Sequence, residues 1–159
     1  MTTLRTGKPR VRVRTKRRKP TPAERAASPD RWVRVDVASD PAVSQEILLK
    51  LACDSDAGVR AAVAFNRQAP AEALNSLVAD ADHHVRARLA ENANAGRDVL
   101  GRLAGDPDRE VRSCVARNRN TSPEVLAQLA VDKNSCCHMD GSMIERGAAR
   151  GRLRLRNEQ

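Results

Sequence analysis

The sequence predicts an all-α solenoid of about four 26-residue units, each built from two short helices. Three observations predict this fold class. The middle of the 159-residue chain matches itself at an offset of 26 residues. Trp32 and Phe65 are the only aromatic side chains, so the core must be built from Leu, Val, Ile and Ala. Neither helix of a unit is able to bury its apolar stripe alone, so neighbouring units must stack and share one core.

The repeat runs through both halves of each unit. Val-Arg pairs open the units at 33–34, 59–60, 85–86 and 111–112. Leucines recur in the second halves at Leu48, Leu74, Leu100 and Leu126. Polar residues follow each Val-Ala or Leu-Ala pair at Asp40, Asn66, Asn92 and Asn118. This agreement at a single period indicates tandem structural repeats.

The fourth unit shows how each helix is expected to begin and end. Asp106 is the expected N-cap and Pro107 the first helical residue, which gives a first helix over residues 107–117. Asn118 is a suitable left-handed residue at its end. Ser122, followed by Pro and Glu, then opens a second short helix with its apolar residues on one face.

These residues carry a family resemblance. The pattern L-A-x-D-(P/S/A)-D-x-x-V-R-x-x-V-A-x-N, clearest at 103–118 and followed by the segment 121–130, resembles the leucine-rich repeat variant family. HEAT-type repeats are similar. The resemblance covers residues 29 to about 132 and implies an α-helix paired with a 3₁₀ helix in a right-handed superhelix. Some members hold an iron-sulfur centre through cysteines before the repeats, but no cysteine precedes Cys53 here, so no cofactor is expected.

An aspartate and an arginine six residues apart recur at each junction between units. The residues are Asp54, Arg60, Asp80, Arg86, Asp106 and Arg112. They fit either a binding groove or a structural ladder, in which each Asp accepts hydrogen bonds from its own first turn and from an Arg of an adjacent unit. The ladder is favoured, because residues present in every unit are those that stacking demands.

The net charge of +9 lies in the N-terminal segment. Residues 1–28 are predicted to be a disordered basic arm, residues 29–137 the leucine-rich repeat variant solenoid, and residues 138–159 a basic C-terminal tail. The expected phosphate-binding residues are Arg5, Lys8, Arg10, Arg12, Arg14, Lys16, Arg17, Arg18 and Lys19. Valines alternate with arginines at 10–14, so ordering as a strand on contact with phosphate is an alternative.

The remaining conspicuous residues are expected to have no catalytic or metal-binding role. His83 and His84 are interpreted as exposed loop residues, because nothing local supplies converging carboxylates or cysteines. Cys136, Cys137 and the histidine after them are adjacent and do not easily converge on one ion. Trp32 is expected to cover the exposed end of the first repeat. No nucleophile-base or phosphate-loop motif is present, so no enzyme is predicted.

Two function classes fit the sequence. The first is a non-enzymatic, nucleic-acid-associated accessory protein, whose arm binds DNA phosphates without sequence specificity and whose solenoid binds a partner protein or a second copy. The alternative is a protein-interaction scaffold that binds no nucleic acid. The absence of an export signal or long apolar run favours a cytoplasmic protein without membrane insertion. The arginine-rich composition and layout are similar to small accessory proteins of actinomycete conjugative plasmids, which implies a role in plasmid transfer or spread.

Overall fold

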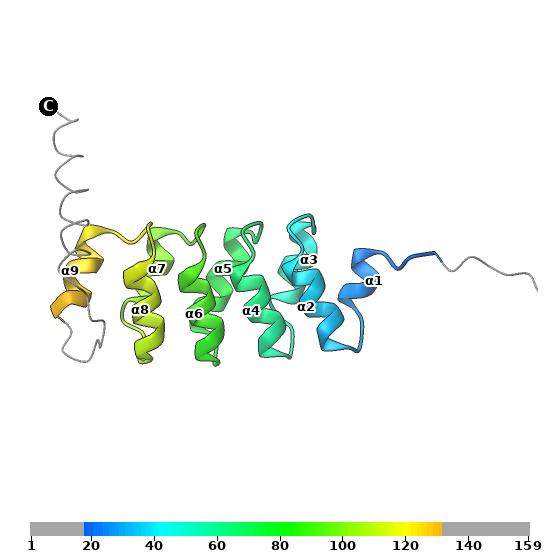
Figure 1. Ribbon diagram of the computed structural model, residues 1–159, viewed down its shortest axis with the longest axis horizontal. Coiled ribbons are helices and arrows are strands. Elements are labelled where there is room, and N and C mark those ends of the chain that lie inside the picture. The colour runs from blue at the N-terminus through cyan, green and yellow to red at the C-terminus, as the bar shows by residue number, and fades with distance from the viewer. Residues whose placement is uncertain (1–17, 132–159) are drawn as a thin grey trace, which may run out of the picture.

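The structure, a computed structural model, describes residues 18–131. These residues form helices that stack side by side along one axis (Figure 1). The α-helices are α1 (Pro22–Ala26), α2 (Arg31–Ser39), α3 (Gln45–Leu51), α4 (Ala57–Phe65), α5 (Ala71–Ser76), α6 (His83–Glu91), α7 (Arg97–Leu103), α8 (Arg109–Arg117) and α9 (Pro123–Val131). The predicted all-α repeat solenoid is confirmed for this part of the chain.

Each of the four units contributes its first helix to one layer and its second helix to the other. Helices α2, α4, α6 and α8 pack on one another in sequence, and the second helix of each unit completes the other layer (Figure 1). The second helices are mainly α-helical. Among the described residues, one 3₁₀ segment occurs, η1 (Leu77–Ala79), which directly follows α5. Within residues 18–131, a 3₁₀ segment of the kind implied by the resemblance therefore occurs in the second unit, where it continues an α-helix.

One continuous apolar core runs between the two layers. Val59, Val85 and Val111 hold the same position in successive units and are fully buried. Leu74 and Leu100 hold equivalent positions in the second layer and are also buried. Burying a side chain of this size contributes about 1.5–3 kcal/mol, so the residues that recur every 26 positions supply the stacking energy.

The first helix of each unit begins at an aspartate N-cap, but not at the one expected. Asp108 caps α8 by accepting a hydrogen bond from the Glu110 N–H at 2.7 Å. The prediction that Asp106 is the N-cap and Pro107 the first helical residue is wrong. Asp106 instead accepts from the Asp108 N–H at 2.9 Å, and so shapes the turn that precedes the helix.

The end of the same helix also differs from the prediction. Asn118 was expected to be left-handed, but its φ of −69° and ψ of 131° are those of extended backbone. No residue in 18–131 has a positive φ. From this extended position the Asn118 side chain bonds to the preceding unit, as described below.

The N-terminal end of the solenoid is covered by α1. A capping box between Thr21 and Glu24 starts this helix, and Ala26 packs against the core. The interpretation of residues 1–28 as wholly disordered is therefore wrong for α1. Trp32 is 66% exposed, so the expectation that it covers the end of the first repeat is also wrong.

Candidate functional site

The junction residues form a ladder of ion pairs between consecutive units. Arg60 donates from Nε to Asp80 Oδ2 at 2.7 Å and from Nη2 to Asp80 Oδ1 at 2.9 Å. Arg86 holds Asp106 in the same two-pronged way, at 2.7 and 3.1 Å. Arg34 and Asp54 form an equivalent pair one unit earlier. Each of these pairs ties a first helix to the junction that follows its unit.

The third guanidinium nitrogen of each arginine binds the chain at the start of its own unit. Nη1 of Arg60 donates to the Asp54 carbonyl at 2.7 Å, and Nη1 of Arg86 donates to the Asp80 carbonyl at 2.6 Å. Arg112 donates to the Asp106 carbonyl at 2.7 Å. Every nitrogen of Arg60 and Arg86 thus has an acceptor within the protein. These arginines hold the units together and are not available to an external phosphate.

Each ladder pair joins two opposite charges. The hydrogen bonds from Arg34 hold the pKa of Asp54 below its ordinary value. The hydrogen bonds to Asp80 raise the pKa of Arg60. The aspartate and the arginine of each pair are therefore both charged across the physiological range, and the hydrogen bonds between them are charge-assisted.

A second ladder, of asparagines, crosses the opposite end of the first helices. Asn92 donates from Nδ2 to the Ala64 carbonyl at 2.8 Å and to the Asn66 carbonyl at 3.1 Å. Asn66 and Asn118 make the equivalent pair of bonds to the units before them. The recurrence of these residues was visible in the sequence, but their interpretation as helix ends missed this role.

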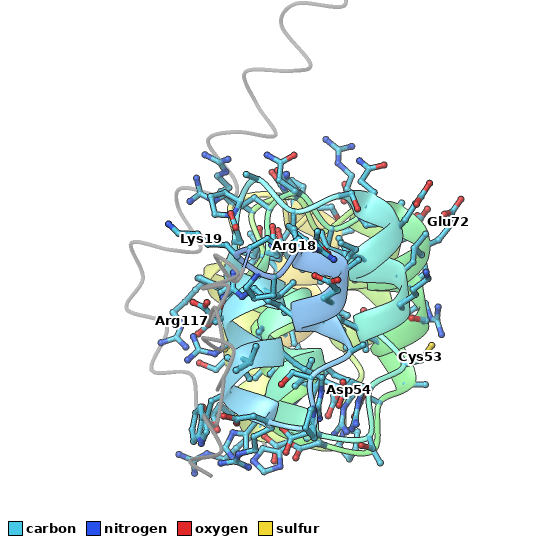
Figure 2. All side chains as sticks on the ribbon, turned by 90° about the vertical axis from the view of Figure 1, so that its right-hand side faces the viewer. Arg18, Lys19, Cys53, Asp54, Glu72 and Arg117 are labelled. Atoms are coloured by element: carbon cyan, nitrogen blue, oxygen red, sulfur yellow. The ribbon has the colours of Figure 1, made fainter. Side chains whose placement is uncertain are left out.

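The exposed side of α2, α4, α6 and α8 carries residues that change from unit to unit. We call it the variable face. It comprises Trp32, Asp36, Ser39, Gly58, Ala62, Phe65, His84, Arg88, Glu91, Glu110 and Arg117. In Figure 2, Arg117 lies on the opposite side of the solenoid from Glu72 of the second layer. The variable face and the second layer therefore present separate surfaces.

Aromatic and charged side chains contact each other along the variable face. The Arg31 guanidinium lies 4.4 Å from the centre of the Trp32 ring. The Arg88 guanidinium lies 5.4 Å from the centre of the Phe65 ring and donates to Glu91 at 3.0 Å. Since Phe65 is on α4 and Arg88 on α6, the second contact crosses from one unit to the next.

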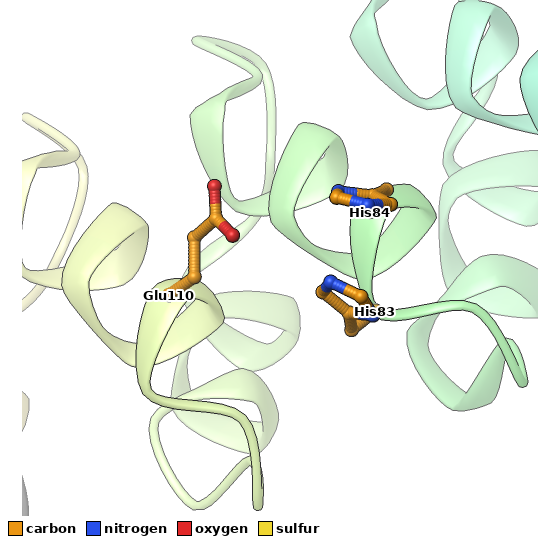
Figure 3. A group of neighbouring side chains, drawn as sticks. All are labelled: His83, His84 and Glu110. Carbon is orange, nitrogen blue, oxygen red and sulfur yellow. The ribbon is translucent and has the colours of Figure 1, made fainter.

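His83 and His84 begin α6 and do not lie in a loop. The stacking of units places Glu110, the second residue of α8, beside them (Figure 3). One ligand atom from each of the three residues lies within 4.8 Å of the others. The expectation that no carboxylate converges on these histidines is therefore wrong. The repeat offset itself contained the signal, because His84 and Glu110 are 26 residues apart.

The residues predicted to bind phosphate lie mostly outside the described part of the chain. Arg5 to Arg17 belong to residues 1–17, and the basic tail at 138–159 and Cys136 and Cys137 belong to residues 132–159. Arg18 and Lys19 are exposed, and Arg18 forms an ion pair with Glu24.

The described part of the chain carries as many acidic as basic side chains. The second layer repeats an exposed acidic residue in the first turn of each helix, at Glu46, Glu72, Asp98 and Glu124. These positions suit the positive helix ends and oppose the approach of a polyanion. None of the helices within 18–131 has the length and apolar character needed to cross a bilayer.

Comparison with known proteins gives one match. Residues 109–134, which include α8 and α9, match the family model described as leucine rich repeat variant. No curated protein and no solved structure matches the chain. The match agrees with the helical repeats of the structure and indicates a repeat protein with a role in protein interaction. None of these comparisons points to a plasmid protein.

Proposed function

We propose that the chain is a non-enzymatic interaction protein whose solenoid binds a partner protein through the variable face. The observation that carries this proposal is the contrast between two sets of described residues. Side chains of the core and the two ladders are of the same kind in successive units, because stacking requires them. The side chains of the variable face differ from unit to unit, whereas the core and the ladders beneath them stay the same. A partner is therefore recognised where the repeat does not dictate the residue.

The composition of the variable face supports this proposal. Trp32 and Phe65 are 66% and 52% exposed, and tryptophan and arginine are among the residues that contribute most to protein interfaces. A guanidinium stacked on each ring also holds that ring in place, which lowers the entropy lost when a partner binds. The two rings lie on α2 and α4, which pack on each other, so one partner is able to contact both.

The test compares two surfaces of the same protein. Tagged full-length chain is used to capture partners from its host, alongside a Trp32→Ala, Phe65→Ala double variant and a Leu49→Ala variant. Leu49 is a matched control, because it is an exposed apolar residue, 37% accessible, on α3 of the other layer. We expect the double variant to lose a partner that Leu49→Ala retains. Equal capture by all three proteins would contradict the proposal.

We further propose that the basic residues between Arg5 and Lys19 bind the phosphate backbone of nucleic acid, with DNA as the first candidate. The charge distribution supports this second activity. The net charge of +9 arises from the N-terminal segment, and the ladder arginines of the solenoid already bind protein acceptors. Contacts to phosphate of this kind carry no sequence information, so the binding is non-specific. A scaffold without nucleic-acid binding is the alternative outcome.

Salt dependence tests this activity. If about 6 to 8 cations each meet a phosphate, the slope of log affinity against log salt is about −5 to −7. The test variant replaces Arg10, Arg12 and Arg14 by glutamine, which should reduce the slope by about 3. A variant with the same loss of charge on the solenoid replaces the exposed Arg67, Arg97 and Arg102 by glutamine and should bind as the parent does. Equal weakening by both variants would refute an arm-specific site.

A further inference from the structure

His83, His84 and Glu110 meet where the third and fourth units stack (Figure 3). Their candidate ligand atoms all lie within 4.8 Å of one another, and the two imidazole centres are 4.0 Å apart. We propose that these three side chains form a binding site for one divalent transition-metal ion of the zinc class. The site joins the first turn of α6 to the first turn of α8.

The donor set selects the class of ion. Two imidazole nitrogens and one carboxylate oxygen form a set that binds zinc in proteins, with water at the fourth position. Magnesium and calcium prefer oxygen donors throughout, so the two histidines disfavour them. Nickel and copper also accept imidazole, and zinc is the probe chosen here because it needs no particular ligand-field geometry.

The side chains have room to close on an ion. A zinc–nitrogen bond of about 2.0–2.1 Å in a tetrahedral site places neighbouring ligand atoms about 3.3 Å apart. No separation within the group exceeds 4.8 Å, so the atoms need to approach by at most about 1.5 Å. His84 and Glu110 are exposed and His83 is half-buried. Rotation of these side chains achieves the closure without a shift of the core.

The surrounding charges favour a cation. The positive ends of α6 and α8 oppose it, but each end also carries an aspartate N-cap. Asp82 accepts from the His84 N–H at 2.8 Å, and Asp108 accepts from the Glu110 N–H at 2.7 Å. Asp108 also lies within electrostatic reach of His83. With Glu110, the first turns of α6 and α8 and their caps thus carry three carboxylates.

The fold does not itself require histidines at these positions. The equivalent first residues of the other first helices are Arg31 and Trp32 in α2 and Ala57 and Gly58 in α4. Each of those helices also begins at an aspartate N-cap, Asp30 or Asp56. The donor set therefore occurs at one junction within 18–131, and an ion bound there would link two units that otherwise share the ladder contacts found throughout.

Zinc titration of the full-length chain tests the proposal. We expect one equivalent of zinc to bind by calorimetry, and both His84→Gly and Glu110→Gln to weaken that binding at least tenfold. His138→Ala and Glu72→Gln are matched controls, because they remove the same groups elsewhere in the chain, and both should bind as the parent does. Zinc should also raise the thermal unfolding midpoint of the parent and of Glu72→Gln, but not that of His84→Gly.

Two outcomes would overturn the proposal. One is the absence of saturable zinc binding by the full chain. The other is binding that survives His84→Gly and is lost when Cys136 and Cys137 are replaced by serine. Far-ultraviolet circular dichroism checks that the variants are folded. If His84→Gly loses helicity, His84→Trp replaces it, because Trp32 occupies the equivalent position of the first unit, and the same tenfold loss is required.

Discussion

Replacing Asn92 by alanine should destabilise the solenoid more than any exposed substitution. Asn92 is 1% accessible. Its side chain donates to two main-chain carbonyls of the preceding unit and accepts from the Asn94 N–H at 2.8 Å. A hydrogen bond contributes about 1 kcal/mol net, so the loss of three should cost about 3 kcal/mol. Urea unfolding followed by helical circular dichroism measures this difference.

The same position in the first unit provides the control. Asp40 accepts from the Ala42 N–H at 2.8 Å, which matches the accepting role of Asn92. Within residues 18–131 the first unit is preceded by the single helix α1, so its side chain at this position has no preceding Asn-bearing unit to donate to and an aspartate suffices. Asp40→Asn should therefore change the unfolding free energy by less than about 0.5 kcal/mol, whereas Asn92→Asp should destabilise at least as much as Asn92→Ala. A loss below 1 kcal/mol for Asn92→Ala would refute the interpretation of this ladder.

Three further predictions concern the ladder ions and the cysteines. Arg86→Ala leaves a buried carboxylate without its partner and should cost about 3 kcal/mol or more in urea unfolding. The lowered pKa of Asp54, caused first by the hydrogen bonds from Arg34, stabilises the fold above the ordinary pKa of about 3.8. This contribution is lost as the pH falls through the lowered value, so acid unfolding should begin at higher pH in Arg34→Met. Cys114 is buried, and burial raises its pKa, so peptide mass spectrometry should find it alkylated more slowly than the exposed Cys53.

The fold class was predictable because stacking imposes the same demand on every unit. A position that must be apolar in one unit must be apolar 26 residues later, which is why Val59, Val85 and Val111 recur and are all fully buried. The helix starts were less predictable. Each junction holds two aspartates with one residue between them, as at 106 and 108, and both are good caps. The contact with an arginine of the previous unit decides between them, and that contact is absent from the local sequence.

The histidine and glutamate cluster was missed for a related reason. The sequence close to His83 and His84 holds no set of converging ligands, whereas a solenoid brings together residues one repeat apart. The 26-residue register places Glu110 beside His84 without any further information. Trp32 was misjudged by the opposite error, because an unusual residue in the terminal unit was assigned to the terminus. Its repeat position is exposed in later units, at Gly58 and His84, and it is exposed in the first unit as well.

The division between constant and variable residues makes stability and recognition separable by experiment. Asn92 and Arg86 each bond to a neighbouring unit, and the equivalent residues of other units make the same bonds at their own interfaces. Trp32 and Phe65 are exposed and contribute little to burial, so their loss should leave the unfolding free energy almost unchanged. A variant that loses a partner while keeping its stability thus identifies the recognition surface. If Trp32→Ala destabilised the fold as much as Asn92→Ala, the variable face would be needed for stacking, as the core and the ladders are. The proposed function would then lose its main support.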